Sequence, residues 1–349
     1  MKQTYFFRPS NPLNTHQSLD IKLVKENIDA GKETTLLIDT NLLIAIEKAV
    51  KLGNSIVALE QMGLGKLVSL ARSSPPKSLC LSPGRALAEM PPALASISRS
   101  AYEVFCSVHL PTFVDAPNAI QTQFKGKEVD FGFDDLGITE QQVLAIPYFS
   151  LLVLNLADKK LKMQPLKKLE FFFEKLRTDL NVLSAKEIEI AKYCLLEPKA
   201  AEILTIATRR ILRSNFLKTK YDKSIASSKE AFAVAFNGAC DLMLINAATL
   251  VQSQGLDGIP QDCWIATADR KLYEFSSIFG YIDAFGQVGQ FAASSINKEQ
   301  AVNSDWLFAN EWQRNATQMR INHQRPSPDD LLISVQRAIE WTSEFYNIS

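Results

Sequence analysis

Four acidic residues of the sequence lie at or near predicted strand–helix junctions, where carboxylates can take part in chemistry. Asp39 follows the apolar run 36–38, and Asp269 follows the run 264–268. Each run is typical of a short buried strand that leads into a helix. An Asp in this position either caps the following helix or belongs to a site, because parallel sheets build their sites at the carboxyl ends of strands.

The other two acids are predicted to lie on helices. Glu89 is on a helix that follows a third predicted strand, 78–81, and that Ser82 caps. Asp241 lies in the first turn of a later helix if Asn237 is the cap of that helix. Strand ends and the starts of the following helices share one edge of a parallel sheet. We therefore expect the four acids to converge at that edge.

Converging carboxylates predict a metal site. Without a cation they would repel one another, and several would be protonated. Mg²⁺ and Mn²⁺ prefer carboxylate and water oxygens, and two such ions about 4 Å apart can hold a phosphodiester, activate a water and stabilise the leaving oxygen. Each acid alone also has a structural interpretation, as a helix cap, a first-turn acid or a solvated side chain.

The pattern of apolar residues divides the chain into strand–helix and helical parts. Strand–helix alternation covers 34–98 and returns in 230–296, which predicts one discontinuous core. Between them, 99–229 shows apolar residues at helical period, and 1–33 and 297–349 are predicted helical extensions. We expect an α/β fold, a parallel Rossmann-like sheet flanked by helices, with a mostly helical insertion. The insertion contains the capping-box pairs Thr139 with Gln142, Ser184 with Glu187, and Ser227 with Glu230.

Composition narrows the class of protein. The 349 residues are 46% hydrophobic and 22% charged, which is ordinary for a globular protein. No apolar run reaches the roughly 18 residues of a membrane-spanning helix, and the N-terminus lacks the apolar stretch of a signal peptide. The scattered cysteines and histidines predict neither a zinc site nor a disulfide framework. We expect a cytoplasmic protein, and its net charge of zero means that a polyanion would need a local basic surface.

One basic tract provides such a surface. Cations would contact phosphates, and interleaved aromatic side chains, Phe216 and Tyr221, would stack on the bases of a single-stranded RNA. The alternative is a solvated helix end, where the helix dipole favours basic residues. The basic residues of the tract are Arg209, Arg210, Arg213, Lys218, Lys220 and Lys223.

Four segments resemble, in order and context, the motifs of the PIN-domain nucleases: LLIDTNLLI, SPGRALAEM, ACDLMLINAA and WIATADRKL. The resemblance implies a parallel α/β sheet, a metal-binding acidic cluster and cleavage of RNA. Thr267 matches the hydroxyl residue of the strand-end motif, and Asn41 matches the Asp-x-Asn form of the first motif. The long separation of Glu89 from Asp241 departs from compact family members and implies a large helical insertion. By position, the resemblance assigns the catalytic and metal-binding roles to Asp39, Glu89, Asp241 and Asp269.

Other functions compete with this one. A phosphatase of the haloacid dehalogenase type needs a second acid two residues after the first, where this chain has Asn41. A catalytically silent PIN-like binding or scaffold module needs no convergence of the acids. A DNA-directed nuclease of the flap-endonuclease group tends to carry more acids and a strongly basic surface. We therefore predict a metal-dependent endoribonuclease that uses Mg²⁺ or Mn²⁺.

The expected partners follow from that activity. RNA is the predicted substrate, and the additional helices are expected to bind a protein inhibitor, a regulatory partner or a second copy of the chain. No membrane partner is expected. The class of RNA is left open, as is the choice between a toxin, a defence effector and an RNA-processing enzyme.

Overall fold

The computed structural model describes residues 3–9, 18–110, 131–160, 162–219, 222–276, 278–283, 291–295, 298–319 and 324–348. The chain forms two compact units. Unit 1 comprises Met1–Phe131, Leu244–Ser277 and Asp283–Phe291, and unit 2 comprises Gly132–Met243, Ile278–Ile282 and Ala292–Ser349. The fold is mixed α/β and mainly helical, as predicted for the class. The predicted division into a core, an insertion and two extensions stays a prediction.

The main sheet lies in unit 1 and has the strand order β1-β4-β2-β3 within the described residues. Its strands are β1 (Tyr5–Phe7), β2 (Glu33–Ile38), β3 (Leu79–Ser82) and β4 (Gln261–Thr267). β2 pairs in parallel with β3 and with β4, whereas β1 pairs antiparallel with β4. Leu37 lies opposite Ser82, and Ile38 lies opposite Ala266, so the three parallel strands end at the same edge. The sequence did not predict β1.

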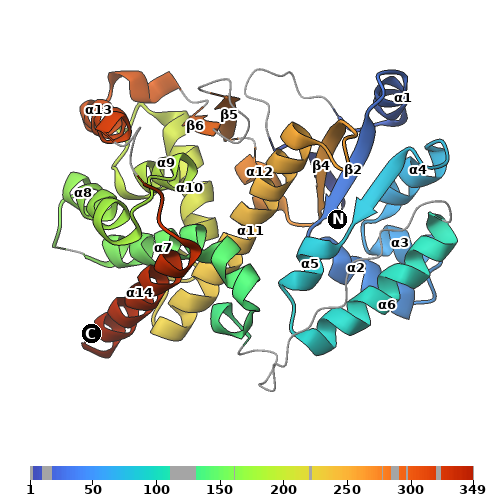
Figure 1. Ribbon diagram of the computed structural model, residues 1–349, viewed down its shortest axis with the longest axis horizontal. Coiled ribbons are helices and arrows are strands. Elements are labelled where there is room, and N and C mark those ends of the chain that lie inside the picture. The colour runs from blue at the N-terminus through green and yellow to red at the C-terminus, as the bar shows by residue number, and fades with distance from the viewer. Residues whose placement is uncertain are drawn as a thin grey trace. The chain divides into compact units, whose positions relative to one another are not determined.

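Helices flank this sheet (Figure 1). α2 starts directly after β2, and the predicted helix of 56–71 is divided at Gly63, whose φ of 78° is readily adopted only by residues without a Cβ. α5 follows β3, and α12 follows β4. The helices of unit 1 are α1 (Ile21–Asp29), α2 (Thr40–Lys51), α3 (Ile56–Gln61), α4 (Gly65–Ser73), α5 (Gly84–Ala88), α6 (Pro92–His109) and α12 (Arg270–Ser276).

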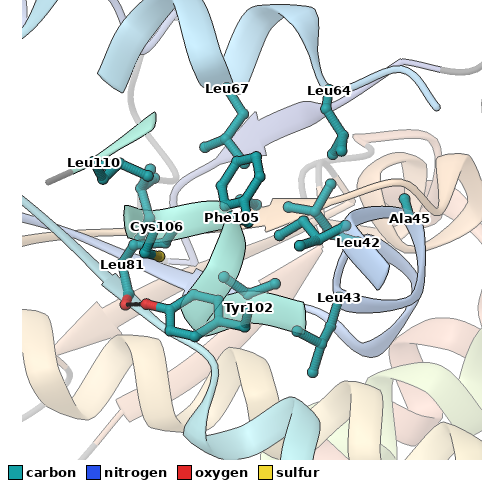
Figure 2. Packing of buried hydrophobic residues seen from close by; sticks show 14 of the residues in the cluster. Leu42, Leu43, Ala45, Leu64, Leu67, Leu81, Tyr102, Phe105, Cys106 and Leu110 are labelled. Atoms are coloured by element: carbon teal, nitrogen blue, oxygen red, sulfur yellow. Dashed lines mark hydrogen bonds between the residues drawn. The ribbon is translucent and has the colours of Figure 1, made fainter. Parts of the chain in front are cut away.

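The core of unit 1 packs α2 and α6 against the sheet. Figure 2 shows Tyr102 and Phe105 of α6 among the leucines of this core, with Leu42 of α2 beside them. The hydroxyl of Tyr102 donates to the carbonyl oxygen of Leu81, which joins α6 to β3 (Figure 2). Full burial of one such side chain contributes about 1.5–3 kcal/mol to folding, so this packing fixes the positions of the strand ends.

A buried polar network lies around Asp262, which is 5% exposed on β4. Arg8, just after β1, donates to its carboxylate from Nε at 2.8 Å and from Nη2 at 2.7 Å. Asn27 of α1 donates at 2.7 Å and the indole of Trp264 at 3.0 Å. The guanidinium of Arg8 also lies 4.7 Å from the centre of the Trp264 ring. The network therefore ties the N-terminal segment and α1 to β4.

Unit 2 is mainly helical in its described part. Its aromatic core includes Phe172 and Phe173, both buried, and Phe173 stacks on Trp312 with ring centres 4.1 Å apart. These phenylalanines therefore pack inside the helical region. The helices are α7 (Ile138–Lys159), α8 (Pro165–Lys175), α9 (Ala185–Leu195), α10 (Ile203–Phe216), the first part of α11 (Ser228–Gln254), α13 (Ser304–Met319) and α14 (Pro328–Ile348). Short helical segments are η2 (Phe133–Asp135), η3 (Leu176–Leu180) and η4 (Lys298–Val302). The strands β5 (Phe279–Asp283) and β6 (Phe291–Ser295) pair with each other.

Helix starts were the least predictable feature. α11 (Ser228–Gln254) begins well before Asn237, so the prediction that Asn237 caps this helix is wrong and Asp241 is not in its first turn. Ser227 instead accepts a hydrogen bond from the Glu230 N–H at 3.2 Å, as its capping box predicted. The predicted cap at Thr139 is also wrong, because α7 begins at Ile138. The predicted cap at Ser82 is wrong as well, because Ser82 is the last residue of β3 and Pro83 is the N-cap of α5. A residue type that can cap a helix was therefore not sufficient to locate these three helix starts.

α11 is also the helix, among the described residues, that is long and apolar enough to cross a membrane. Of its most apolar window, 61% is buried inside the molecule. A core helix of a folded domain has the same length and composition, and the burial favours that interpretation. It ends where predicted, before Gly255, whose φ is 74°.

We expect Gly238→Ala to destabilise the protein. Ala normally stabilises a helix by about 0.5–1 kcal/mol relative to Gly. Here a Cβ would lie 2.8 Å from Cδ1 of Leu151 and 2.8 Å from Cδ1 of Phe216, so these buried side chains or the helices that carry them must shift. Overpacking of this kind costs about 1–3 kcal/mol, which should appear as a lower free energy of unfolding in urea. A rise in stability would show that the helices can separate without cost.

Candidate functional site

Asp39 is both a helix cap and a buried acid at the edge of the sheet. It is the N-cap of α2, is 3% exposed, and accepts a hydrogen bond from the Asn41 N–H at 3.3 Å. Its own N–H donates to the carbonyl oxygen of Ala266 at 3.0 Å, which continues the pairing of β2 with β4. The Thr267 hydroxyl donates to the same carboxylate oxygen, Oδ2, at 2.7 Å. The structural and chemical interpretations of this residue are therefore compatible.

Thr267 links Asp39 to Asp269. While donating to Asp39, its hydroxyl oxygen accepts a hydrogen bond from the Asp269 N–H at 2.8 Å. The Asp269 carboxylate accepts from the Lys271 N–H at 2.7 Å at the start of α12, and its negative charge acts on Asp39. Thr267 therefore contacts both acids, and Asp39 and Asp269 lie near each other, while the supporting role of Thr267 in a site stays a prediction.

Glu89 reaches the same group of acids from α5. It is the C-cap of that helix and is partly buried. The hydroxyl of Thr40, the first residue of α2, donates to its Oε2 at 2.8 Å. The charge of Asp39 acts on Glu89, and so does the opposite charge of Arg85 one turn earlier. The structure therefore brings together Asp39, Glu89 and Asp269.

The electrostatics of the site favour protonated acids in the absence of a cation. Burial, the largest cause, and the charge of Asp269 raise the pKa of Asp39 to about 6, although hydrogen bonds from Thr267 and Asn41 oppose the shift. Burial and the charge of Asp39 raise the pKa of Glu89 to about 8, against hydrogen bonding by Thr40 and the charge of Arg85. Shifts of this size and cause are typical of functional sites, and a bound cation would reverse them.

The remaining predicted acid, Asp241, lies on α11 in the portion that belongs to unit 2 and is partly buried. Its participation in the site stays a prediction. Asn41 contributes its N–H to Asp39, but Asn41 itself is exposed. Sequence reasoning missed Thr40. A hydroxyl residue directly after the strand-end Asp was the available signal, but its partner Glu89 could not be identified without the fold.

The described part of the basic tract forms contacts within the protein. Arg209 pairs with Glu197 at 2.7 Å, and Arg213 pairs with Asp158 at 2.8 Å. Arg210 is exposed, Lys218 donates to the Ser224 hydroxyl at 3.2 Å, and Lys220 and Tyr221 lie outside the described residues. The prediction that Phe216 stacks on a base is wrong for this structure, because Phe216 is 1% exposed. RNA contact by the basic residues stays a prediction.

The carboxylates of the site can be set against the two ways in which proteins hold a divalent cation. In the part of the chain that the structure describes, no group of three or more Asp, Glu, His or Cys side chains is arranged to hold a metal ion. Mg²⁺, however, is usually bound by one or two carboxylates together with waters and substrate phosphates. The described hydrogen bonds to Asp39 and Glu89 are accepted by Oδ2 and Oε2, and both side chains are carboxylates. Their donor chemistry fits this second mode.

No protein-family model, curated protein or solved structure matches the chain. What the protein does is therefore inferred from the residues of unit 1. The strongest features there are the shared sheet edge, the hydrogen bonds of Thr40 and Thr267, and the raised pKa values of Asp39 and Glu89.

We expect Glu89→Gln to stabilise the cation-free protein at alkaline pH. The pKa of Glu89 is raised in the folded state from 4.5 to about 8, so the folded protein holds the proton more tightly than the unfolded chain. Stability from this group is present below pH 4.5 and is lost as pH rises towards 8. The variant should therefore gain about 2–4 kcal/mol above pH 8 and little near pH 4, as measured by urea unfolding in EDTA.

The exposed Glu26 on α1 supplies a matched control for this experiment. Glu26→Gln should change the free energy of unfolding by less than about 0.5 kcal/mol at both pH values. Equal stability of the Glu89→Gln and unsubstituted proteins above pH 8 would show that Glu89 is not held in a desolvated acidic site.

Proposed function

We propose that the protein is a metal-dependent nuclease of the PIN-like type that hydrolyses RNA phosphodiester bonds. The observation that supports this most is the grouping of Asp39, Glu89 and Asp269 at the carboxyl edge of parallel strands, with the pKa values of Asp39 and Glu89 raised. A site that destabilises its own carboxylates is suited to a ligand that carries positive charge. Mg²⁺ and Mn²⁺ match oxygen ligands of this kind.

Each residue has a defined task in this mechanism. Asp39 and Glu89 would hold the cation, and Asp269 adds negative charge beside Asp39. Thr267 fixes the Asp39 carboxylate by its hydrogen bond at 2.7 Å. When bound, the metal would supply an activated water and neutralise the charge that develops on the phosphate and leaving oxygens. Arg85, whose positive charge acts on Glu89, would attract the phosphate anion towards this edge of the sheet.

The activity can be tested with a labelled single-stranded RNA and the full chain. We expect cleavage with Mg²⁺ or Mn²⁺, loss of cleavage on addition of EDTA, and recovery when the divalent cation is restored in excess. Attack by a metal-activated water should leave 5′-phosphate and 3′-hydroxyl ends, which mass spectrometry can identify. A single-stranded DNA of the same sequence is the control for substrate class.

Two results would contradict the proposal. Products that end in a 2′,3′-cyclic phosphate and form in EDTA would indicate attack by the ribose 2′-hydroxyl. Absence of cleavage for all RNAs, together with tight RNA binding, would instead favour the alternative of a catalytically silent binding module.

A further inference from the structure

We infer that Thr40 is a positioning residue that holds Glu89 in place for a divalent cation at the Asp39 edge of the sheet. This inference rests on the proposed function. Thr40 is the first residue of α2 and directly follows Asp39. Its hydroxyl donates to Oε2 of Glu89 at 2.8 Å, across a sequence separation of 49 residues.

The contact is more specific than the usual hydrogen bond of a threonine at a helix start. Hydroxyl residues there mostly bond to neighbouring backbone groups of their own helix. Thr40 instead reaches α5, where the Ala86 carbonyl oxygen is a second acceptor at 3.4 Å. A hydroxyl has one proton, and the shorter contact is the one to Glu89. Thr40 therefore joins the helix that follows Asp39 to the helix that carries Glu89.

The same hydroxyl chemistry occurs twice at this edge. Thr267 donates to Oδ2 of Asp39 at 2.7 Å, and Thr40 donates to Oε2 of Glu89 at 2.8 Å. Each carboxylate is thus oriented by a threonine hydroxyl that donates to one of its oxygens. Groups that orient metal ligands in this way typically contribute about 10- to 100-fold to metal affinity.

Mn²⁺ binding provides a test that does not depend on catalysis. Electron paramagnetic resonance measures the concentration of free Mn²⁺ during titration of the full chain. Circular dichroism confirms that each variant is folded. We expect Thr40→Val, which keeps the shape but removes the hydroxyl, to weaken Mn²⁺ binding about 10- to 100-fold. Thr40→Ser keeps the hydroxyl and should bind within about threefold of the unsubstituted protein if positioning is the cause.

A matched control is available in the same sheet. Thr35 is buried on β2, and its hydroxyl donates to Gln261 at 2.6 Å, near the opposite end of the strand from Asp39. Thr35→Val removes a buried threonine hydroxyl without touching Glu89, so Mn²⁺ affinity should be unchanged. In a Glu89→Gln background, Thr40→Val should cause little further loss, because both changes act on one side chain.

The outcomes separate the inference from the proposed function. Equal Mn²⁺ affinity of Thr40→Val and the unsubstituted chain would overturn the inference, and so would an undiminished loss in the Glu89→Gln background. An equal loss of Mn²⁺ affinity in Thr35→Val would also overturn it, since removal of any buried threonine hydroxyl near the sheet would then weaken binding. If the unsubstituted chain binds no Mn²⁺, the proposed function itself fails, and the role of Thr40 fails with it.

Discussion

An Asp39→Asn protein is expected to fold normally and to lose RNA cleavage by more than about 100-fold. Removal of a group that only orients a metal ligand already lowers metal affinity or activity about 10- to 100-fold, and Asp39 is proposed as a ligand itself. Asn is as good an N-cap as Asp, so α2 should still start at Thr40. The change should appear mainly in kcat/KM for RNA with Mg²⁺, measured on protein whose circular dichroism is unchanged.

The same substitution should raise the stability of the cation-free protein. The pKa of Asp39 is raised from 3.8 to about 6 in the folded state, so stability from this group is lost as pH rises through that interval. Above pH 6 the variant should gain about 1–3 kcal/mol, since it has no buried charge to desolvate. Lost activity with higher stability is typical of a residue kept for function rather than for folding.

Asp20→Asn is the matched control for Asp39→Asn. Asp20 is also an N-cap, and its side chain accepts from the Leu23 N–H at 2.9 Å at the start of α1. The control substitution should leave cleavage unchanged and alter stability by less than about 0.5 kcal/mol. If Asp39→Asn cleaves RNA at the unsubstituted rate, Asp39 is a cap and not a catalytic residue.

Asp262→Ala is expected to have the largest effect on stability, a loss of about 3–5 kcal/mol. Its carboxylate accepts hydrogen bonds from Arg8, Asn27 and Trp264, and each of these bonds would be lost in a largely buried environment. Removing one partner of a buried pair is costly, and here the Arg8 guanidinium would lose both of its hydrogen bonds to the Asp262 carboxylate. Urea unfolding monitored by circular dichroism measures the loss. The loss is a large part of the total free energy of unfolding of a native domain, which is about 5–15 kcal/mol.

A surface ion pair shows what an ordinary pair contributes. Arg99 and Glu103 lie one turn apart on α6, with side chains 33% and 52% exposed. Glu103→Ala should cost less than about 1 kcal/mol. A similar small cost for Asp262→Ala would show that water replaces the carboxylate and that the network does not hold the N-terminal segment.

Local patterns were sufficient to predict the elements that carry Asp39 and Asp269. Each acid follows a short buried strand, and both the strand and the cap are encoded within about ten residues. β1 could not be predicted in this way, because its three residues are ordered by pairing with β4 at the far end of the chain. The contact between Thr40 and Glu89 was equally hidden, since it depends on how α5 packs.

The basic tract shows what a sequence pattern cannot supply, namely the partners of each charge within the fold. Its spacing indicated a surface for RNA, but Arg209 and Arg213 have acidic partners elsewhere in unit 2, and Phe216 is buried. The sequence does not show which acid pairs with a given basic residue, because such partners come from other helices. Burial is the more frequent fate of a phenylalanine than exposure on the surface.

The short strand β1 has a consequence for the solubility of the protein. All seven residues of β4 are buried, and without β1 its backbone N–H and C=O groups would form an open edge of the sheet. An exposed apolar edge strand is a template for pairing with other chains. β1 covers this edge at Ile265, Ala266 and Thr267, so truncation of the N-terminus would expose that part of β4 and favour aggregation.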